Sequence, residues 1–294
     1  MRTAVVDIGS NTGRLLVAES RGVSIEPVYE QKTYLGLGEE IERRGRISGA
    51  KLAGAAQCVR KYVRAGHKLG AGSCDVIVTA PGRQSANAAA LLAALERAAG
   101  AAAVRVLSPD EEGRLAYEGA VVLAEGLPES IAVCDVGGGS TEVVVGTRSA
   151  GPAWSRSLDI GSLRLTSRCL GDDLPGKRAL EAAREELERA FEGFVSPLPQ
   201  AALAAGGTAR ALRRIVGWTL GAAELDDALR LLTKRSASGI AQEFGIDLWR
   251  ARTLAGGTLI LAEVQRRLAI PFEVARGGLR EGAAAARLSE LAAA

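Results

Sequence analysis

The chain contains the same glycine-turn pattern twice, once in each half. Residues 4–17 (AVVDIGSNTGRLLV) and residues 132–145 (AVCDVGGGSTEVVV) align without a gap at an offset of 128 residues. In each copy an apolar run ends in an aspartate, a turn follows, and a second apolar run returns, which is typical of two strands joined by a tight turn. Consecutive glycines let backbone N–H groups converge on an anion with no side chain in the way. We therefore predict two phosphate-binding hairpins that frame the whole chain.

The length of 294 residues and the internal repeat both indicate two domains. We place the first domain at residues 1–125 and the second at residues 126–294. The last helix, at about residues 280–293, could pack back on the first domain. With 47% hydrophobic and only 4% aromatic residues, the two cores must consist mainly of Ala, Val, Leu and Ile.

The composition excludes several classes of protein. A net charge of +3 is too small to indicate a coat for nucleic acid. The four cysteines have no Cys-x-x-Cys spacing, and His67 is the single histidine, so a zinc site or a Cys–His nucleophile is not expected. The N-terminus enters a strand with no signal segment, and no apolar run has membrane-spanning length. These features predict a cytoplasmic protein with reduced thiols and no membrane partner.

Strand and helix signals alternate along the chain in the manner of an α/β fold. The third strand is expected at Val23–Tyr29, a Gly-rich charged loop at Leu35–Glu40, and a turn at residues 80–83. A small-residue strand at residues 201–205 leads into Gly206-Gly207-Thr208 and a helix that contains Arg210. Taken alone, such a Gly-Gly-Thr sequence is often only a site of tight packing.

The helix that follows Ser108 has unusually clear start signals. Ser108 stands at the N-cap, Pro109 at the first helical position, and Glu111 where a capping box needs an acidic residue. Glu111 therefore has a local structural role and begins the polar face of the helix. Glu112 begins the apolar face that continues through Leu115. A carboxylate on the inward face with no local partner is a functional candidate.

The combination of two Asp-x-Gly hairpins and a later strand–Gly-Gly-Thr–helix resembles the actin-like, hexokinase-like and sugar-kinase ATPase superfamily. That resemblance implies an actin-like (ribonuclease H-like) fold of two duplicated domains with an interdomain cleft. Within the superfamily the chain closely resembles the exopolyphosphatase/guanosine pentaphosphate phosphohydrolase (Ppx/GppA) family. The matching positions, in family order, are residues 7–12, Thr79, Arg83, Asn87, residues 111–115, 135–142, Gly161, residues 164–166, 206–208 and 278–282.

The family resemblance assigns roles to individual residues. Glu112 matches the catalytic glutamate, Arg83 a phosphate-binding arginine, and Asp135 and Glu142 the metal-side carboxylates. Asp7 is a further metal candidate, and the expected cofactor is Mg²⁺ or Mn²⁺. The phosphate-binding residues are predicted to be Ser10, Asn11, Thr12, Gly137, Gly138, Gly139, Ser140, Thr141, Gly206, Gly207 and Thr208.

These roles predict a mechanism for hydrolysis of a terminal phosphoanhydride. Backbone N–H groups of the two hairpins would hold the phosphoryl group, and Arg83 would stabilise charge on its oxygens. Glu112 would take a proton from the attacking water.

The chain also departs from the family pattern. It has no room for the helical C-terminal domains of the long members, so it resembles a short two-domain form. Gly36-Leu37-Gly38 stands where the family has Arg-Leu-Gly, and Arg252 stands where an acidic residue is usual. Ala275-Arg276 replaces the usual Ser-led pair. These differences leave chain-length preference and the contacts along a polyphosphate channel open.

Three alternatives remain beside hydrolysis of inorganic polyphosphate. The same site could remove the 5′-phosphate of guanosine pentaphosphate, a reaction of the stringent response. An ATP-dependent kinase or actin-like ATPase could use the same fold, although nothing beyond Gly206-Gly207-Thr208 indicates an adenosine pocket. A non-catalytic binder is a third class, against which the intact set of acidic residues argues. By analogy with short-form members, a homodimer could form.

Overall fold

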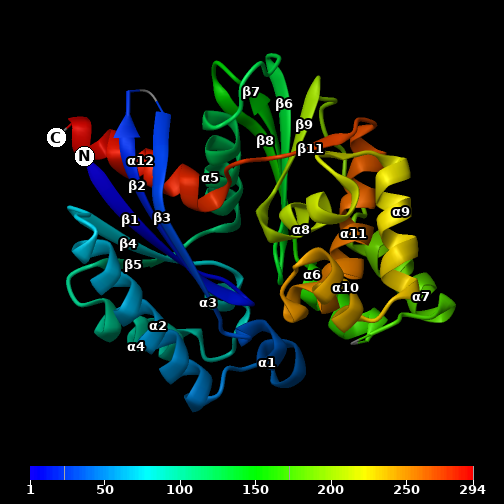
Figure 1. Cartoon of the computed structure of the whole chain (residues 1–294), viewed down its shortest axis with the longest axis horizontal. Coiled ribbons are helices and arrows are strands. Elements are labelled where there is room, and N and C mark those ends of the chain that lie inside the picture. The colour runs from blue at the N-terminus through cyan, green and yellow to red at the C-terminus, as the bar shows by residue number, and fades with distance from the viewer. Residues whose placement is uncertain (23, 172, 294) are drawn as a thin grey trace. The chain divides into compact units, whose positions relative to one another are not determined.

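The computed structural model describes residues 1–22, 24–171 and 173–293, and it divides into two compact units (Figure 1). Unit 1 consists of Met1–Leu123 and Gly277–Ala294, and unit 2 consists of Ala124–Arg276. The predicted second domain extended to residue 294, whereas the structure assigns the segment from Gly277 onward to unit 1. Each unit has its own β-sheet and its own hydrophobic core.

Unit 1 contains a five-stranded sheet in the order β3-β2-β1-β4-β5. Its strands are β1 (Arg2–Ile8), β2 (Thr12–Arg21), β3 (Ser24–Tyr34), β4 (Ser73–Val78) and β5 (Ala103–Val106). The first three strands form an antiparallel meander, and β4 and β5 run parallel to β1. Side chains of β1 alternate between the two faces of the sheet, and both faces are buried because helices cover each of them.

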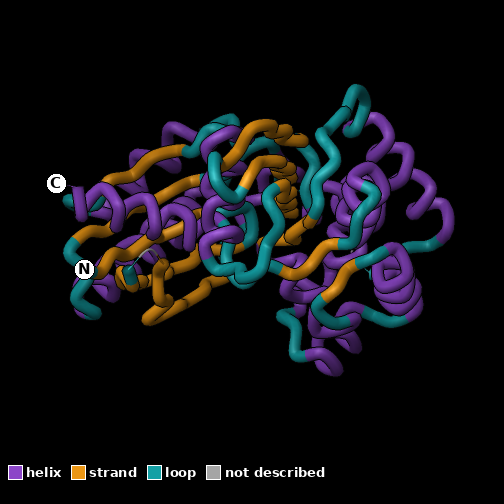
Figure 2. Tube along the Cα trace, turned by 90° about the horizontal axis from the view of Figure 1, so that it is seen from above, coloured by secondary structure: helices purple, strands orange, loops and turns teal. Residues whose placement is uncertain are grey.

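The helices of unit 1 are α1 (Leu37–Arg44), α2 (Gly49–Lys68), α3 (Ala80–Gln84), α4 (Ala88–Ala99), α5 (Pro109–Val122) and α12 (Leu279–Ala293). Helices α2 and α4 pack on the face that carries Val6 and Ile8. Helices α5 and α12 lie on the face that carries Val5 and Leu16. In both views α12 ends close to the start of β1 (Figures 1 and 2).

Glycines allow α12 and the loop before it to approach α5 very closely. A Cβ atom on Gly119 would lie 2.0 Å from the carbonyl oxygen of Gly278, and one on Gly282 would lie 1.9 Å from the carbonyl oxygen of Leu115. Only residues without a Cβ fit where two backbones are this close. This crossing explains why the last helix belongs to the first unit.

Unit 2 contains a six-stranded sheet in the order β10-β11-β9-β6-β7-β8. Its strands are β6 (Ser130–Val136), β7 (Thr141–Thr147), β8 (Gly151–Leu158), β9 (Ala201–Ala205), β10 (Thr219–Leu220) and β11 (Phe272–Val274). Its helices are α6 (Ser162–Leu165), the π-helical turn η1 (Thr166–Leu170), α7 (Lys177–Ala190), α8 (Gly206–Val216), α9 (Ala222–Lys234), α10 (Ala237–Phe244) and α11 (Leu248–Leu268).

The predicted duplication is visible in the strand pairing. The β1–β2 hairpin pairs Asp7 with Arg14, and the β6–β7 hairpin pairs Asp135 with Glu142. The same cross-strand pair of positions therefore recurs 128 residues later. In each sheet the hairpin is followed by a third antiparallel strand on one side and a parallel strand on the other.

Three local expectations were wrong, and each has a physical reason. The charged segment after Leu35 forms helix α1, since Glu39 and Glu40 in its first turn and two arginines in its last turn complement the helix dipole. A short helix, α3, replaces the turn at residues 80–83. Strand β3 runs from Ser24 to Tyr34, five residues beyond the predicted end, and Val23 lies outside the described residues.

Candidate active site

The turn of the first hairpin is held by backbone hydrogen bonds from residues 35–38, at the start of α1 and just before it. The N–H of Gly9 donates to the carbonyl of Thr12 at 3.0 Å and closes the turn. The carbonyl of Ser10 accepts from Gly38 at 2.7 Å, and the carbonyl of Asn11 accepts from the N–H groups of Leu35 and Gly36. The predicted phosphate-binding residues of unit 1 are therefore fixed in position.

Asn11 has an unsatisfied donor in this turn. The residue is 6% exposed, and its side-chain nitrogen Nδ2 is buried with no acceptor among the described residues. A buried amide without a partner costs free energy, and a phosphate oxygen is an acceptor that would satisfy it. The geometry therefore fits the prediction that Asn11 binds phosphate.

Glu112 and Arg83 come together in unit 1. The capping box is present, with the N–H of Glu111 donating to Oγ of Ser108 and the N–H of Ser108 donating to Glu111. It fixes the start of α5 and turns Glu112 inward, where the residue is 9% exposed. Nη1 of Arg83, on α3, lies 2.8 Å from Oε2 of Glu112 and donates to the carbonyl of Leu107 at 2.8 Å.

The two glutamates at this helix start differ in their surroundings as predicted. The pKa of Glu111 is lowered, chiefly by the hydrogen bond from the Ser108 backbone. Glu111 also pairs with the exposed Arg105 at 3.0 Å. Glu111 is therefore engaged in the helix cap, whereas the inward face of the helix presents Glu112.

The buried Arg280 lies near Asp7, the metal candidate of unit 1, and near two glutamates. Arg280, in the first turn of α12, is 5% exposed and lies 3.1 Å from Glu30 and 3.5 Å from Glu281. Burial alone would lower the pKa of Arg280, but Glu281, Glu30 and Asp7 raise it. Arg14, the cross-strand neighbour of Asp7, adds a second guanidinium. Asp7 therefore has arginines near it, whereas its counterpart Asp135 in unit 2 has a carboxylate, Glu142, opposite it.

The hairpin of unit 2 places two carboxylates side by side. Asp135 and Glu142 are directly opposite each other in the β6–β7 register. Glu142 is 3% exposed, and Oγ of Ser157 donates to it at 3.0 Å. Unit 1 has Arg14 where unit 2 has Glu142, so the hairpin of unit 1 pairs an acid with a base and the hairpin of unit 2 pairs two acids.

The glycine loop between these carboxylates is oriented by α6. The N–H of Gly137 donates to the carbonyl of Ser140 at 3.0 Å, as in the first hairpin. The carbonyls of Gly137 and Gly138 accept from the N–H groups of Ser162, Leu163 and Arg164 at the start of α6. Because a trans peptide points its N–H opposite to its carbonyl, the N–H groups of Gly138 and Gly139 point away from α6. That orientation fits an anion cradle.

The Gly206-Gly207-Thr208 sequence lies against the same hairpin. Gly206 has φ +81°, and a Cβ there would lie 2.2 Å from Oδ1 of Asp135. Oγ1 of Thr208 donates to the carbonyl of Val136 at 3.0 Å. Another predicted residue, Thr141, donates from its hydroxyl to Ile160 at 2.6 Å. Thr208 and Thr141 are therefore structural supports of the hairpin, and Gly206 lets the chain contact the Asp135 carboxylate.

Arg250, on α11, was not among the predicted site residues. It is 8% exposed, and its Nη1 lies 3.4 Å from Oγ1 of Thr208. Burial and then Arg210 lower the pKa of Arg250 to about 10, against the opposing effects of Asp135 and Asp247. Two neighbouring guanidiniums beside a carboxylate and a glycine loop suit a bound anion. The available signal was the Arg250-Ala251-Arg252 stretch, which the sequence showed without indicating that Arg250 is buried.

The carboxylates of unit 2 are compatible with Mg²⁺ although they do not enclose it. No group of three or more acidic, histidine or cysteine side chains in the described residues could by itself hold a metal ion. Mg²⁺ typically binds one or two carboxylates and takes its other oxygens from water and substrate phosphates. Asp135 and Glu142 fit that pattern.

Comparison with known proteins identifies the family. Residues 16–290 match the model of the Ppx/GppA phosphatase family. The chain belongs to this family. Exopolyphosphatase 2 of Mycobacterium tuberculosis is 28% identical over 91% of both chains. Exopolyphosphatase 1 of Mycobacterium bovis is also 28% identical, over 96% of this chain and 87% of the relative. A Ppx/GppA structure from Aquifex aeolicus superposes with a TM-score of 0.83 at 23% identity, covering 99% of this chain and 98% of the other.

Membership of the Ppx/GppA family confirms the resemblance read from the motifs and the prediction of a phosphatase. The predicted fold, two duplicated α/β units of the actin-like type, is confirmed as well. None of the helices in the described residues is long and apolar enough to cross a membrane.

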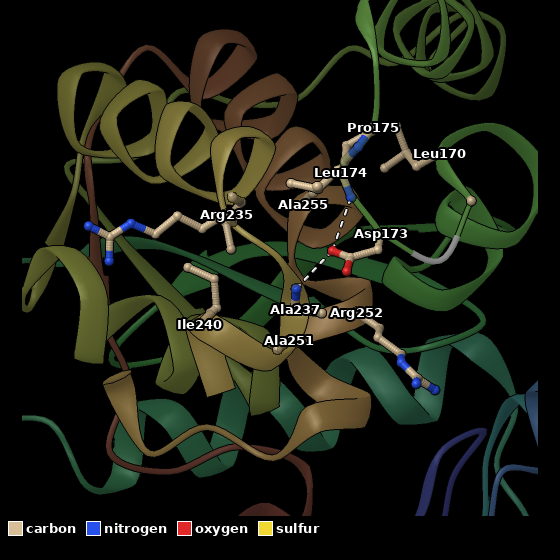
Figure 3. A pocket seen from close by; sticks show the side chains of 12 residues that line it. Leu170, Asp173, Leu174, Pro175, Arg235, Ala237, Ile240, Ala251, Arg252 and Ala255 are labelled. Carbon is tan, nitrogen blue, oxygen red and sulfur yellow. Dashed lines mark hydrogen bonds between the residues drawn. The ribbon is translucent and has the colours of Figure 1, made fainter. Parts of the chain in front are cut away.

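Unit 2 of this Ppx/GppA chain also contains a hollow away from the predicted site residues (Figure 3). It has an empty volume of about 310 Å³, and Leu174, Ile240 and Arg252 are among the residues that line it. Asp173 at its edge accepts from the N–H groups of Leu174 and Ala237. This carboxylate therefore ties the loop before α7 to the start of α10.

Proposed function

We propose that this Ppx/GppA chain is an exopolyphosphatase that hydrolyses the terminal phosphoanhydride of inorganic polyphosphate and releases orthophosphate. The observation that carries the proposal is the contact between Arg83 and Glu112, which places a cation and a candidate base in one position of unit 1. The choice of polyphosphate rests on the two exopolyphosphatases that match nearly the whole chain.

Within unit 1, Glu112 takes the proton from the attacking water. A positioned base of this kind typically contributes about 10²–10⁴-fold to the rate. Arg83 holds Glu112 in place and stabilises negative charge on the phosphoryl oxygens. Ser10, Asn11 and Thr12 bind phosphate oxygens, with the buried amide of Asn11 as the clearest donor.

Within unit 2, the N–H groups of Gly138 and Gly139 and the Arg250 guanidinium bind phosphate. Asp135 and Glu142 would hold Mg²⁺ or Mn²⁺, which when bound neutralises phosphate charge and polarises the P–O bond. Gly206 keeps the backbone of α8 in contact with Asp135, and Ser157 orients Glu142.

This function is tested by measuring phosphate release from three substrates, each with and without Mg²⁺. The substrates are long polyphosphate, guanosine pentaphosphate and ATP. We expect the highest kcat/KM with polyphosphate and loss of activity when EDTA is added. A higher kcat/KM with guanosine pentaphosphate would instead favour the phosphohydrolase alternative. Release from ATP alone would overturn both.

A further inference from the structure

Helix α2 of unit 1 carries a stripe of exposed cations. Arg60, Lys61, Arg64, His67 and Lys68 are all exposed. At 3.6 residues per turn they fall within an arc of about 120°. The opposite side of α2 is buried against the sheet and α4, so the stripe is the outer side of the helix (Figure 1).

The local charge is much larger than the net charge of the chain suggests. Residues 43–74 contain eight Lys and Arg residues and no Asp or Glu. Unit 1 as a whole has 18 basic and 15 acidic residues, and unit 2 has 19 of each. The entire excess of positive charge therefore belongs to unit 1, and the segment around α2 supplies it.

The cations of the stripe have no acidic partners among the described residues. Arg60, Lys61, Arg64 and Lys68 make no ion pair or side-chain hydrogen bond in the part of the chain that the structure describes. By contrast, several exposed arginines of unit 2 pair with acidic neighbours, as in Arg189–Glu186 and Arg235–Glu243. Four adjacent unneutralised cations repel one another, which is a cost that an external polyanion would remove.

The first turn of α2 is connected to the phosphate-binding turn of unit 1. Nζ of Lys51 donates to the carbonyl of Leu35, and the N–H of Leu35 donates to the carbonyl of Asn11 at 2.8 Å. Helix α2 has 20 residues, which is a length of about 30 Å, and ends at Lys68. A single helix thus leads from the predicted phosphate site to the cationic stripe.

We propose that the stripe Arg60–Lys68 on α2 is a docking surface for the distal part of a long polyphosphate chain. This inference rests on the proposed function and extends it, because it makes affinity depend on chain length. Polyphosphate carries charge along its whole length and has no bases or acyl chains. The stripe matches this chemistry, since the exposed residues of α2 include no Phe, Tyr or Trp for base stacking and no large aliphatic side chain for insertion into a membrane.

The test compares two fourfold neutralised variants of the full chain. The stripe variant carries Arg60→Gln, Lys61→Gln, Arg64→Gln and Lys68→Gln. The control variant removes the same charge from exposed positions of unit 2, with Lys177→Gln, Arg178→Gln, Arg184→Gln and Lys234→Gln. Initial rates of phosphate release are measured with long polyphosphate and with tripolyphosphate across a salt series. Binding of a single-stranded oligonucleotide is measured in parallel.

We expect the stripe variant to have a KM for long polyphosphate raised at least about fivefold, with kcat unchanged and KM for tripolyphosphate unaltered. The salt slope of log KM for the long chain should fall by about 3, at roughly 0.7 per lost contact as for single-stranded nucleic acid. The control variant should behave as the wild type does.

An unchanged KM for long polyphosphate in the stripe variant, or an equal rise in both variants, would overturn the docking surface while leaving the proposed function standing. Loss of oligonucleotide binding alone would overturn it too, in favour of nucleic acid. No phosphate release from either substrate by the wild type would instead overturn the proposed function.

Discussion

Nη1 of Arg83 lies 2.8 Å from Oε2 of Glu112, although the two residues are 29 positions apart and belong to different helices. The same Arg83 nitrogen donates to the carbonyl of Leu107, so the guanidinium bridges the end of β5 and the start of α5. Both side chains are largely buried. The contact holds a carboxylate and a cation in a fixed relation before any substrate binds, which is the preorganisation that phosphoryl transfer requires.

Replacing Arg83 should slow turnover without unfolding the protein. We expect Arg83→Gln to lower kcat by about 10²–10³-fold. Arg83→Lys should not restore the rate, because the ammonium of a shorter, more flexible side chain cannot hold the position that the planar guanidinium has between Leu107 and Glu112. Steady-state kinetics with polyphosphate measure kcat for each variant, and the exposed Arg97→Gln is the control. Full activity in Arg83→Lys would show that only the charge matters.

Arg250 should lower the free energy of unfolding of the protein while it contributes to the binding of phosphate. Its pKa is lowered to about 10 by burial and by Arg210, so the folded protein binds the proton less well than the unfolded chain does. The contribution of Arg250 to stability is therefore lowest below pH 10 and recovers as the pH rises above 10. At pH 7 we expect Arg250→Met to raise the free energy of unfolding by about 1 kcal/mol or more.

The same Arg250→Met variant should have a raised KM for polyphosphate. Arg252→Met, two residues away and exposed, is the matched control and should change stability by less than about 0.5 kcal/mol. Urea unfolding followed by circular dichroism measures the first effect. A marked loss of stability in Arg250→Met would mean that the arginine is a structural support and that its burial is compensated.

Gly119 should tolerate no side chain. A Cβ at this position would meet the carbonyl of Gly278 at 2.0 Å, so Gly119→Val has to separate α5 from α12. We expect a loss of at least about 3 kcal/mol in unfolding free energy, at the upper end for overpacking because backbone atoms are involved. Gly54→Ala on the open side of α2, where nothing lies within 4 Å, should instead stabilise the protein by up to about 1 kcal/mol.

Buried thiols should make three of the four cysteines unreactive in the folded protein. Burial raises the pKa of Cys74 to about 12, and it raises the pKa of Cys58 and Cys134 as well. Partial burial also raises the pKa of Cys169, but Cys169 is the one cysteine that is not fully buried and is therefore accessible to a reagent. Titration with a thiol reagent at pH 8 should therefore detect one rapid thiol before denaturation and four afterwards. Rapid reaction of more than one thiol in the native protein would contradict the burial pattern.

Much of the fold could be predicted because its signals are local or repeated. The duplicated hairpins were visible as a 128-residue repeat. The structure shows both with equivalent cross-strand residue pairs and with the same hydrogen bond closing the turn. Glu112 could be assigned to the inward face because the capping box at Ser108 sets where the helix starts. Once the first residue of a helix is known, the direction of each later side chain follows from the helical repeat.

Other features could not be predicted because they depend on long-range contacts. Nothing near Arg83 in the sequence indicates that its partner is Glu112. The burial of Arg250 depends on the packing of α11 beside Thr208. Arg280 likewise meets Glu30 across 250 positions. Helix α1 was missed for a different reason, because it is short and its sequence, with two glycines before and within it and several charged residues, is typical of a loop.

The proposed role of Glu112 as the base is tested most directly by one pair of variants. Glu112→Gln and Glu111→Gln each replace a carboxylate by an amide of the same size, at adjacent residues. Gln can also serve in a capping box. Turnover of long polyphosphate is measured for both. We predict that Glu112→Gln loses about 10²–10⁴-fold in kcat with little change in KM, while Glu111→Gln stays near wild type. Near-normal turnover in Glu112→Gln would contradict the account.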